Sequence, residues 1–408
     1  MTRQELAVNQ KKKQDGLLVN KMMFTLVTLI IYLLGKNLPL YMVDMSKYVQ
    51  QNLGAEDIIM QAIRGDIYRC SLFALGVSPY MISSIIIMII FAFRSSEAKA
   101  KMSPIKMNKL TMRMALIFAV IMAVTQVKSL QFKETTTPLL VIQTVVVAEM
   151  VTGAMLIVWI SSRNKRFGIG GQSALIFINI FDGIASSMRE HTLQVLLIPI
   201  IISVMTIVVM AIMENCEKRI PVQRISIHNI YADKNYLAIK MNPIGVMPAM
   251  FSMSVFLLPQ MLVSMLLIFF PENADILWWQ DNLDLTKPVG IAVYIVILFL
   301  LTMGFSRVFI NPSEMTEQFL KSGDSIQNIH AGKDTKRYLS RIVTVLSFFS
   351  ATIMAVCLAL PIMLQSTGDI PAALSAMPTS FMMLTGLVCN LGREVMAVRH
   401  LEAYKPFI

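Results

Sequence analysis

Two stretches of the sequence decide its fold: Gly76–Ser83 (GVSPYMIS) and Gly245–Ser252 (GVMPAMFS). Both follow the pattern G-V-x-P-x-M-x-S, and they begin 169 residues apart. Each lies in an apolar run, where glycine and proline interrupt what would otherwise be a continuous helix. The matching interruptions predict an internal repeat. The alternative is chance similarity, since eight residues is a short match.

The composition around these stretches is that of a membrane protein. Of the 408 residues, 55% are hydrophobic and 15% are charged, and the mean hydropathy is +0.63. Soluble proteins carry about 25% charged residues. A disordered chain, a collagen-like chain and an ordinary cytosolic enzyme are therefore excluded. The four cysteines are far apart and form no C-x-x-C pair, so neither a disulfide framework nor a zinc site is predicted.

The apolar residues fall into runs long enough to cross a bilayer, which takes about 20 residues per helix. Ten such runs are predicted: 19–38, 71–93, 111–130, 139–161, 172–190, 193–213, 243–268, 289–308, 338–361 and 375–395. The run 172–190 is the least apolar, because it contains Asn179, Asp182 and Arg189. The runs show no alternation of apolar and polar residues, which disfavours a β-barrel.

The two G-V-x-P-x-M-x-S motifs occupy the second and the seventh of these runs. The chain is therefore predicted to consist of two five-helix halves, residues 1–192 and 193–408. An odd number of spans inverts the second half relative to the first. Glycine and proline in corresponding helices of inverted repeats indicate a transport path between the repeats.

Basic residues predict the orientation. When the N-terminus is placed in the cytosol, all but eight of the 36 Lys and Arg residues fall in cytosolic segments. Both termini are then cytosolic, and the net charge of +11 reports topology. A polybasic site for lipid or nucleic acid is the alternative explanation, and we expect no nucleic-acid partner.

Three loops are unusual. The loops 214–242 and 309–337, both on the predicted cytosolic side, mix charged and apolar residues, which is typical either of a docking surface or of a solvated hairpin. On the other side, residues 54–70 have the pattern of a short amphipathic helix. This segment contains Asp57, Ile58, Ile59, Ile63 and Arg64.

Motifs for catalysis are absent from the sequence. It contains no G-x-x-x-x-G-K-[ST] loop, no H-E-x-x-H and no G-x-S-x-G, so neither an enzyme nor a cofactor or metal site is predicted. Glu149 lies within an apolar run, where an ionisable residue is functional by default. A proton-coupled transporter of small solutes that uses Glu149 is therefore the alternative function, and a membrane scaffold without a pore is a third. A protonated or hydrogen-bonded Glu149 at a helix contact is the structural explanation.

The chain resembles the SecY family of protein-conducting channels over nearly its full length. The resemblance rests on Ser71–Tyr80 (SLFALGVSPY), Gly168-Ile169-Gly170, Asn242–Pro259 (NPIGVMPAMFSMSVFLLP) and the segment from Asn311-Pro312 to Gly323. It implies an all-α fold of ten transmembrane helices in two inverted, pseudo-symmetric halves around an hourglass pore.

The resemblance also implies roles for individual residues. An apolar pore ring is expected at Val77, Met81, Ser173, Phe177, Met250 and Met383. The segment 54–70 matches the position of the plug helix. The second and third predicted spans, against the seventh and eighth, match the lateral gate, which opens toward membrane lipid. Gln126 matches a polar position of this gate. Such a constriction would leak few ions, because a bare ion loses its hydration there.

The cytosolic surface is where the sequence departs from the family. Ile329-His330-Ala331-Gly332 stands where the family has Arg-Pro-Gly, and the C-terminal tail lacks a basic end. These departures resemble the accessory branch of the family in Gram-positive bacteria, which exports serine-rich glycoproteins through the cell membrane. The general housekeeping channel of the family is the alternative within the resemblance. The resemblance implies an unfolded polypeptide as substrate. It implies three kinds of protein partner: a SecA-type motor ATPase, a SecE-like small membrane subunit and accessory Sec proteins. Motor docking is expected at Arg219, Arg224, Lys321, His330, Lys333, Lys336 and Arg337.

Overall fold

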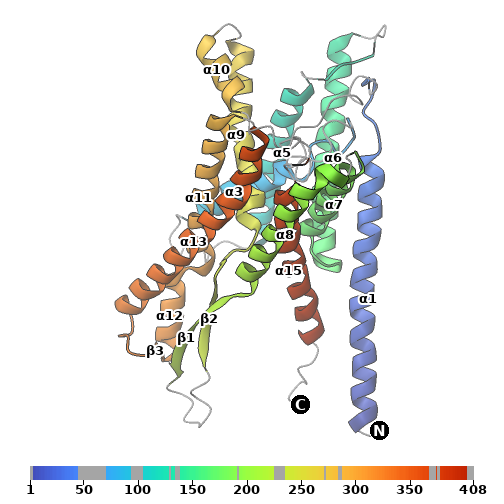
Figure 1. The fold of residues 1–408 in the computed structure, drawn as a ribbon. Coiled ribbons are helices and arrows are strands. Elements are labelled where there is room, and N and C mark those ends of the chain that lie inside the picture. The colour runs from blue at the N-terminus through green and yellow to red at the C-terminus, as the bar shows by residue number, and fades with distance from the viewer. Residues whose placement is uncertain are drawn as a thin grey trace.

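The structure is a computed structural model of the chain. It describes residues 3–44, 70–92, 104–127, 130–133, 138–190, 193–224, 235–270, 273–283, 287–366, 374 and 377–401. Over these residues the chain is almost entirely helical, and a small sheet projects from one end of the bundle (Figure 1).

The helices are α1 (Arg3–Lys36), α3 (Ser78–Ala92), α5 (Pro104–Val127), α6 (Leu139–Phe167), α7 (Gln172–Glu190), α8 (Leu193–Asn215), α9 (Met247–Phe269), α10 (Ala274–Asn282), α11 (Pro288–Ile310), α12 (Pro312–Ser322), α13 (Lys333–Ser366) and α15 (Met377–Leu401). The strands are β1 (Glu217–Arg224), β2 (Tyr236–Lys240) and β3 (Asp324–Ile326).

Each of the ten predicted apolar runs coincides with a helix. By length and composition, eight helices in the described part of the chain could cross a membrane. The apolar parts of α3 and α7, Ser78–Ile90 and Gln172–Ala185, are shorter. A mostly helical membrane protein is therefore confirmed, and ten crossings in two halves stay a prediction.

Several predicted boundaries are displaced, for identifiable reasons. The run predicted to begin at residue 71 becomes helical only at Ser78, and that predicted at 243 only at Met247. In both cases a glycine with positive φ precedes the helix. Conversely, α5 begins at Pro104, seven residues before the apolar run, because the basic residues Lys106 and Lys109 belong to the helix.

Of the three polar residues that made 172–190 the least apolar run, Asn179 and Asp182 find partners on α1, and Arg189 is exposed. The Tyr32 hydroxyl and the Asn179 amide are hydrogen-bonded and both buried, and Lys36 Nζ lies 2.7 Å from Asp182 Oδ2. Buried polar groups need such partners, since an unpaired one costs about 1–3 kcal/mol. The polar face of α7 is thus directed at α1.

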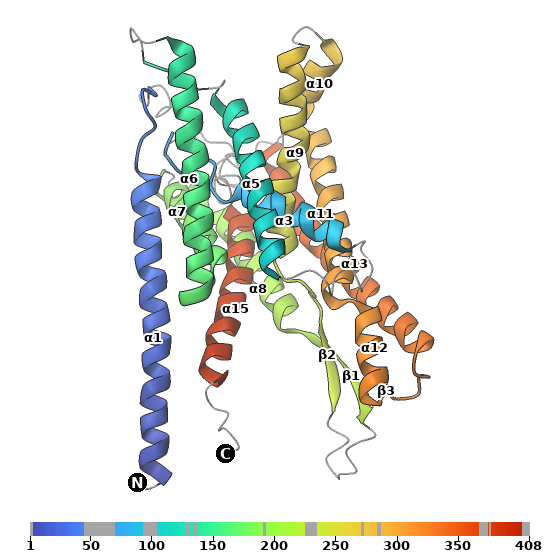
Figure 2. The ribbon, with the colours of Figure 1, turned by 180° about the vertical axis from the view of Figure 1, so that it is seen from behind.

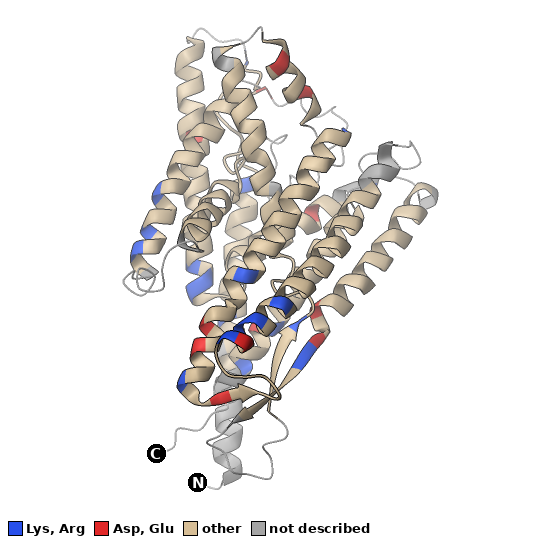
Figure 3. Cartoon of the chain, turned by 90° about the vertical axis from the view of Figure 1, so that its left-hand side faces the viewer, with Lys and Arg blue, Asp and Glu red and all other residues tan. Residues whose placement is uncertain are grey.

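One end of the molecule gathers the segments predicted to be cytosolic. The beginning of α1, the end of α15, the β1–β2 hairpin and α12 lie at the same end, and α10 lies at the opposite end (Figures 1 and 2). Lys and Arg residues are concentrated toward the end with the hairpin (Figure 3). This arrangement agrees with the charge pattern of the sequence.

The two loops predicted on this side form a single unit. The sheet has the antiparallel order β2-β1-β3, in which Ile220 pairs with Leu237 and Val222 pairs with Ile326. Ile220, Ile239 and Ile326 are buried with Leu339 and residues of the first half of α13. The hairpin is therefore not simply solvated: the second loop adds its third strand, and α13 adds Leu339, Ile342 and Val343 to its core.

Candidate functional site

The two G-V-x-P-x-M-x-S motifs adopt the same backbone course. Gly76 and Gly245 have φ of 54° and 74°. That region is costly for residues with a Cβ, so glycine suits the bend. Each bend is followed by valine and then by the first residue of a helix, with proline at the second helical position. Proline fits there because the N–H at that position has no partner within the helix.

The repeat continues into the first turn of α3 and α9. The Met81 amide donates to the Val77 carbonyl at 3.1 Å, and the Met250 amide donates to the Val246 carbonyl at 3.3 Å. The two methionines are therefore the fourth residues of their helices. Both side chains are buried, with exposed fractions of 0% and 5%. The prediction of an internal repeat is consistent with this geometry.

Five of the six residues predicted as a pore ring come together in one apolar cluster. Val77, Met81, Met250 and Met383 are buried members of it, and Phe177 packs against it. Ser173 lies one turn before Phe177 on α7 and is half-buried. The cluster draws residues from α1, α3, α6, α7, α8, α9, α11, α13 and α15. It therefore joins the two predicted halves at the centre of the molecule.

The helices predicted to form the lateral gate pack against one another. The Ser254 hydroxyl of α9 lies 3.7 Å from the Met81 sulfur of α3. Further along α9, Leu257 and Met261 are buried in a cluster with residues of α3 and α5. Phe251 of α9 meets Phe305 of α11 edge to face, with ring centroids 5.6 Å apart. Gln126, the predicted gate residue, is half-buried in the last turn of α5.

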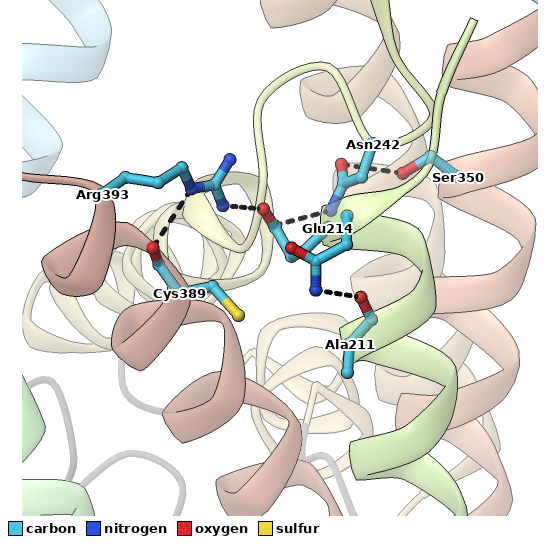
Figure 4. Close-up of polar contacts among 7 residues, drawn as sticks. Ala211, Glu214, Asn242, Ser350, Cys389 and Arg393 are labelled. Carbon is cyan, nitrogen blue, oxygen red and sulfur yellow. Dashed lines mark hydrogen bonds and ion pairs between the residues drawn. The ribbon is translucent and has the colours of Figure 1, made fainter. Parts of the chain in front are cut away.

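A buried carboxylate supports the bend before α9. Glu214, at the end of α8, has a side-chain exposure of 1% and pairs with Arg393 of α15. The Asn242 amide donates to Glu214 Oε1 at 3.3 Å and accepts from the Ser350 hydroxyl of α13 at 3.0 Å (Figure 4). A Cβ on Gly245 would lie 2.8 Å from Glu214 Oε1. The network thus joins α8, α13, α15 and the segment that begins α9.

The Gly168-Ile169-Gly170 segment makes a similar junction in the other predicted half. Asn164 of α6 donates to the carbonyls of Ile169 and Gly171, both at 3.0 Å. The Ile169 amide donates to the Thr25 hydroxyl of α1 at 2.8 Å, and the Gly170 amide donates to Glu394 Oε2 of α15 at 3.0 Å. Neighbouring residues of α15, Arg393 and Glu394, therefore contact opposite halves.

The predicted motor-docking residues lie on the unit formed by the sheet, α12 and the start of α13. Six of these residues have exposed side chains: Arg219, Lys321, His330, Lys333, Lys336 and Arg337. Arg219 bonds Glu217, which raises the pKa of its guanidinium, and it stacks on the Tyr236 ring at 4.7 Å. Arg224 ends β1.

The predicted plug falls outside the described residues. Asp57, Ile58, Ile59, Ile63 and Arg64 all lie in the segment 45–69, which the structure does not describe. Cys70, at the end of the predicted segment, is buried, and its carbonyl accepts from the Leu40 amide.

Glu149, the residue of the alternative function, is hydrogen-bonded in the first half of α6. Its Oε2 accepts from the backbone amide of Tyr41 at 2.9 Å. Tyr41 belongs to the segment that follows α1, so the carboxylate ties that segment to α6. This contact matches the structural explanation for Glu149.

Two groups of residues were not anticipated from the sequence. Val246 is a buried member of the central cluster and packs on Gly386 of α15. The repeat itself contains the signal, since Val246 is the counterpart of Val77. The pairing of Glu214 with Arg393 has no comparable signal, because 179 residues separate the two.

Comparisons with known proteins agree with the resemblance seen in the sequence. The SecY family model matches residues 71–391. The chain is 28% identical over 401 residues to "Accessory Sec system protein translocase subunit SecY2" of Leuconostoc gelidum, covering 94% of this chain and 95% of that one. It is also 28% identical over 404 residues to the protein of the same name from Streptococcus sanguinis, covering 96% and 98%.

Solved structures show the same fold. A protein-conducting channel superposes with a TM-score of 0.66 at 13% identity, covering 94% of this chain and 93% of that one. Sec61 from the canine ribosome–channel complex of the endoplasmic reticulum superposes with a TM-score of 0.60 at 12% identity and the same coverage.

Proposed function

This chain belongs to the SecY family of protein-conducting channels, and from this premise we propose that it is the channel subunit of an accessory translocase. It passes unfolded polypeptides across the bacterial cell membrane, and its substrates are serine-rich glycoproteins. The names of its relatives, at 28% identity over nearly the whole chain, support the accessory assignment.

The observation that carries the proposal is the central apolar cluster. It holds Met81 and Met250 at equivalent positions of the two motif copies, together with Val77 and Met383. In the proposed channel these side chains, with Phe177 and Ser173, form the constriction. An apolar constriction resists ions because dehydrating an ion is costly. Flexible thioethers can repack around the varied side chains of a passing chain.

The seam between α3 and α5 on one side and α9 and α11 on the other serves as the lateral gate. Its contacts are apolar, as in the packing of Leu257 and Met261. Separating these helices exposes apolar surface, which lipid tails solvate better than water does. An apolar segment in the channel would then leave through the seam according to its own transfer free energy. Gln126 is the polar position near this seam.

Energy for transport comes from a partner in this proposal, a SecA-type motor ATPase. The motor docks on the unit that contains Arg219, Lys321 and Lys333, and this end of the molecule faces the cytosol together with both termini. A SecE-like subunit holds the halves together, and the segment 54–70 serves as the plug.

A crosslinking experiment tests the channel. A photo-crosslinking amino acid replaces Met81 or Met250 in vesicles that contain the motor, ATP and a stalled substrate. We expect crosslinks from both positions to the substrate. The matched control is Met205, an exposed methionine on α8, from which no substrate crosslink is expected. Absence of crosslinks from positions 81 and 250 would contradict the proposal and favour a scaffold without a pore.

Motor docking and the alternative function have separate tests. Replacing Lys333, Lys336 and Arg337 with Gln should reduce motor-dependent transport, whereas replacing the exposed Lys106 and Lys109 of α5 should not. Equal transport in the two variants would contradict docking on this unit.

The alternative function is tested at Glu149. The Glu149→Gln variant should leave polypeptide export intact. Loss of uphill uptake of a small solute in this variant would instead support a proton-coupled transporter.

A further inference from the structure

The short helix α10 presents its apolar side chains to the surroundings. It connects the ends of α9 and α11 that lie far from the chain termini (Figures 1 and 2). None of its nine residues is buried. Leu277, Trp278 and Trp279 are 45%, 52% and 45% exposed, and the two indole rings meet edge to face. Exposed tryptophan pairs are unusual on a surface that faces only water.

The helix is fixed at both ends. Asn273 caps its beginning, accepting from the Asp275 amide at 3.1 Å. Gln260 of α9 donates to the Leu283 carbonyl at 3.0 Å just after its end. These contacts orient α10, but a helix of this length is marginal in water without packing on one face. Within the described residues α10 lies against α9 and α11, yet none of its residues is buried. Most of its apolar surface is therefore left for another neighbour to cover.

The apolar surface of α10 continues one on α9. Leu262, Met265, Leu266 and Phe270 are exposed at spacings of three and four residues, and so lie along one face of α9 and its end. On a candidate membrane-spanning helix, such a face contacts lipid tails. The stripe leads directly to α10, which makes lipid the natural neighbour of the short helix as well.

The third tryptophan, Trp159, allows the level of α10 to be compared with the thickness of a bilayer. Trp159 of α6 is also exposed, and Arg163 lies over its ring at 5.5 Å. From Trp159 back to Leu139, where α6 begins, the helix rises about 30 Å, the thickness of a bilayer core. The beginning of α6 and α10 lie at the same level in both views (Figures 1 and 2). Tryptophan favours both boundaries of the core.

We propose that α10 is an interfacial anchor that inserts Leu277, Trp278 and Trp279 into the headgroup region of the leaflet farther from the termini. The anchor fixes the connection between α9 and α11 at the membrane surface, and Asp275 and Asp281 remain in contact with water. This seating is independent of the proposed function, because it needs neither substrate nor motor.

Tryptophan fluorescence tests the anchor directly, because the chain has only three tryptophans. In the Trp159→Phe variant all emission comes from Trp278 and Trp279. The protein is reconstituted at low density in phosphatidylcholine vesicles that carry a spin label near the headgroup or deep in the acyl chain. We expect greater loss of emission with the shallow label than with the deep one, and little loss with aqueous iodide.

Two control variants calibrate depth. Trp278→Phe/Trp279→Phe leaves Trp159, which should also respond more to the shallow label. Met205→Trp, in a chain whose three tryptophans are Phe, places a reporter on an exposed position midway along α8 and should respond more to the deep label. Circular dichroism checks that each variant keeps its helix content.

Two outcomes would overturn the proposal. Strong quenching of Trp278 and Trp279 by iodide, with neither spin label effective, would place α10 in water. Quenching by none of the three agents would mean that protein covers the helix, for example a second copy of this chain.

Discussion

The two copies of the G-V-x-P-x-M-x-S motif have the same backbone but different supports. The bend at Gly76 is held by short backbone bonds, such as that from the Gly76 amide to the Phe73 carbonyl at 2.9 Å, and by packing of Phe73 on Tyr32 and Gly35. The bend at Gly245 rests on the buried Glu214–Arg393 network. Equivalent local geometry is thus stabilised by apolar packing in one half and by paired charges in the other.

This difference matters because the two supports respond differently to change. Packing fails gradually as volume is removed, whereas a buried ion pair fails when either partner is lost. The copies should therefore behave alike when their shared residues are altered and differently when their supports are altered.

The shared methionines should give the largest effect. Replacing Met81, Met250 and Met383 together with Ser should increase resting ion conductance in planar bilayers, since the apolar side chains that exclude ions are shortened. Met81→Ser and Met250→Ser alone should increase it to similar extents. Met205→Ser on the exposed face of α8 is the control and should change nothing. Unchanged conductance in the triple variant would show that these residues do not form the seal.

The charged support should give the next largest effect. Arg393→Ala leaves the buried Glu214 carboxylate without its cation and should cost about 3–5 kcal/mol of stability. Arg399→Ala removes an exposed arginine from the same helix and is the control. Thermal unfolding in detergent measures both variants. Equal midpoints would mean that the bend at Gly245 does not depend on the ion pair.

Substituting Gly76 and Gly245 should give a smaller loss of stability, which differs between the two motif copies. Gly76→Ala and Gly245→Ala each force a Cβ into positive φ, at about 1–2 kcal/mol. In Gly245→Ala the Cβ would also approach Glu214 Oε1 to 2.8 Å, which adds to this cost. Gly304→Ala, on an open face of α11, should be neutral or stabilising. A greater loss of stability in Gly76→Ala than in Gly245→Ala would contradict the proposed difference between the two supports.

The last serine of each motif should give the smallest effect. The Ser252 hydroxyl lies 3.0 Å from the hydroxyl of the buried Tyr294, whereas the Ser83 hydroxyl donates to the Pro79 carbonyl in its own helix. Ser252→Ala should therefore cost about 1 kcal/mol, and Ser83→Ala less. Chemical denaturation of the two variants measures the difference. If Ser83→Ala is the more costly, the bond between α9 and α11 contributes little.

Some of the candidate site could be predicted from residues close together in the sequence. The pattern around Gly76 and Gly245 indicated two equivalent interruptions, and alignment to the family placed Met81 and Met250 in one apolar cluster. The apolar runs indicated where helices would lie, although not their ends. Lys106 and Lys109 extend α5 beyond its apolar run, and Gly76 delays α3.

Other contacts required the three-dimensional arrangement. Asn179 and Asp182 are unfavourable in a membrane helix when only the sequence is considered. In the structure, Tyr32 and Lys36 of α1 lie beside them and pair with them. In the sequence, Glu214 is an ordinary charged residue that follows an apolar run. In the structure, α15 places Arg393 beside it.

The sequence alone therefore determined what depends on neighbouring residues: the apolar runs, the glycine–proline bends and the distribution of charge. Backbone conformation and transfer into lipid are local properties, so a short window of sequence is enough to predict them. Only the tertiary structure decided which distant groups meet, as when β3 completes the β1–β2 hairpin or Glu394 reaches the Gly170 amide. Those pairings depend on where whole helices pack, which no single segment encodes.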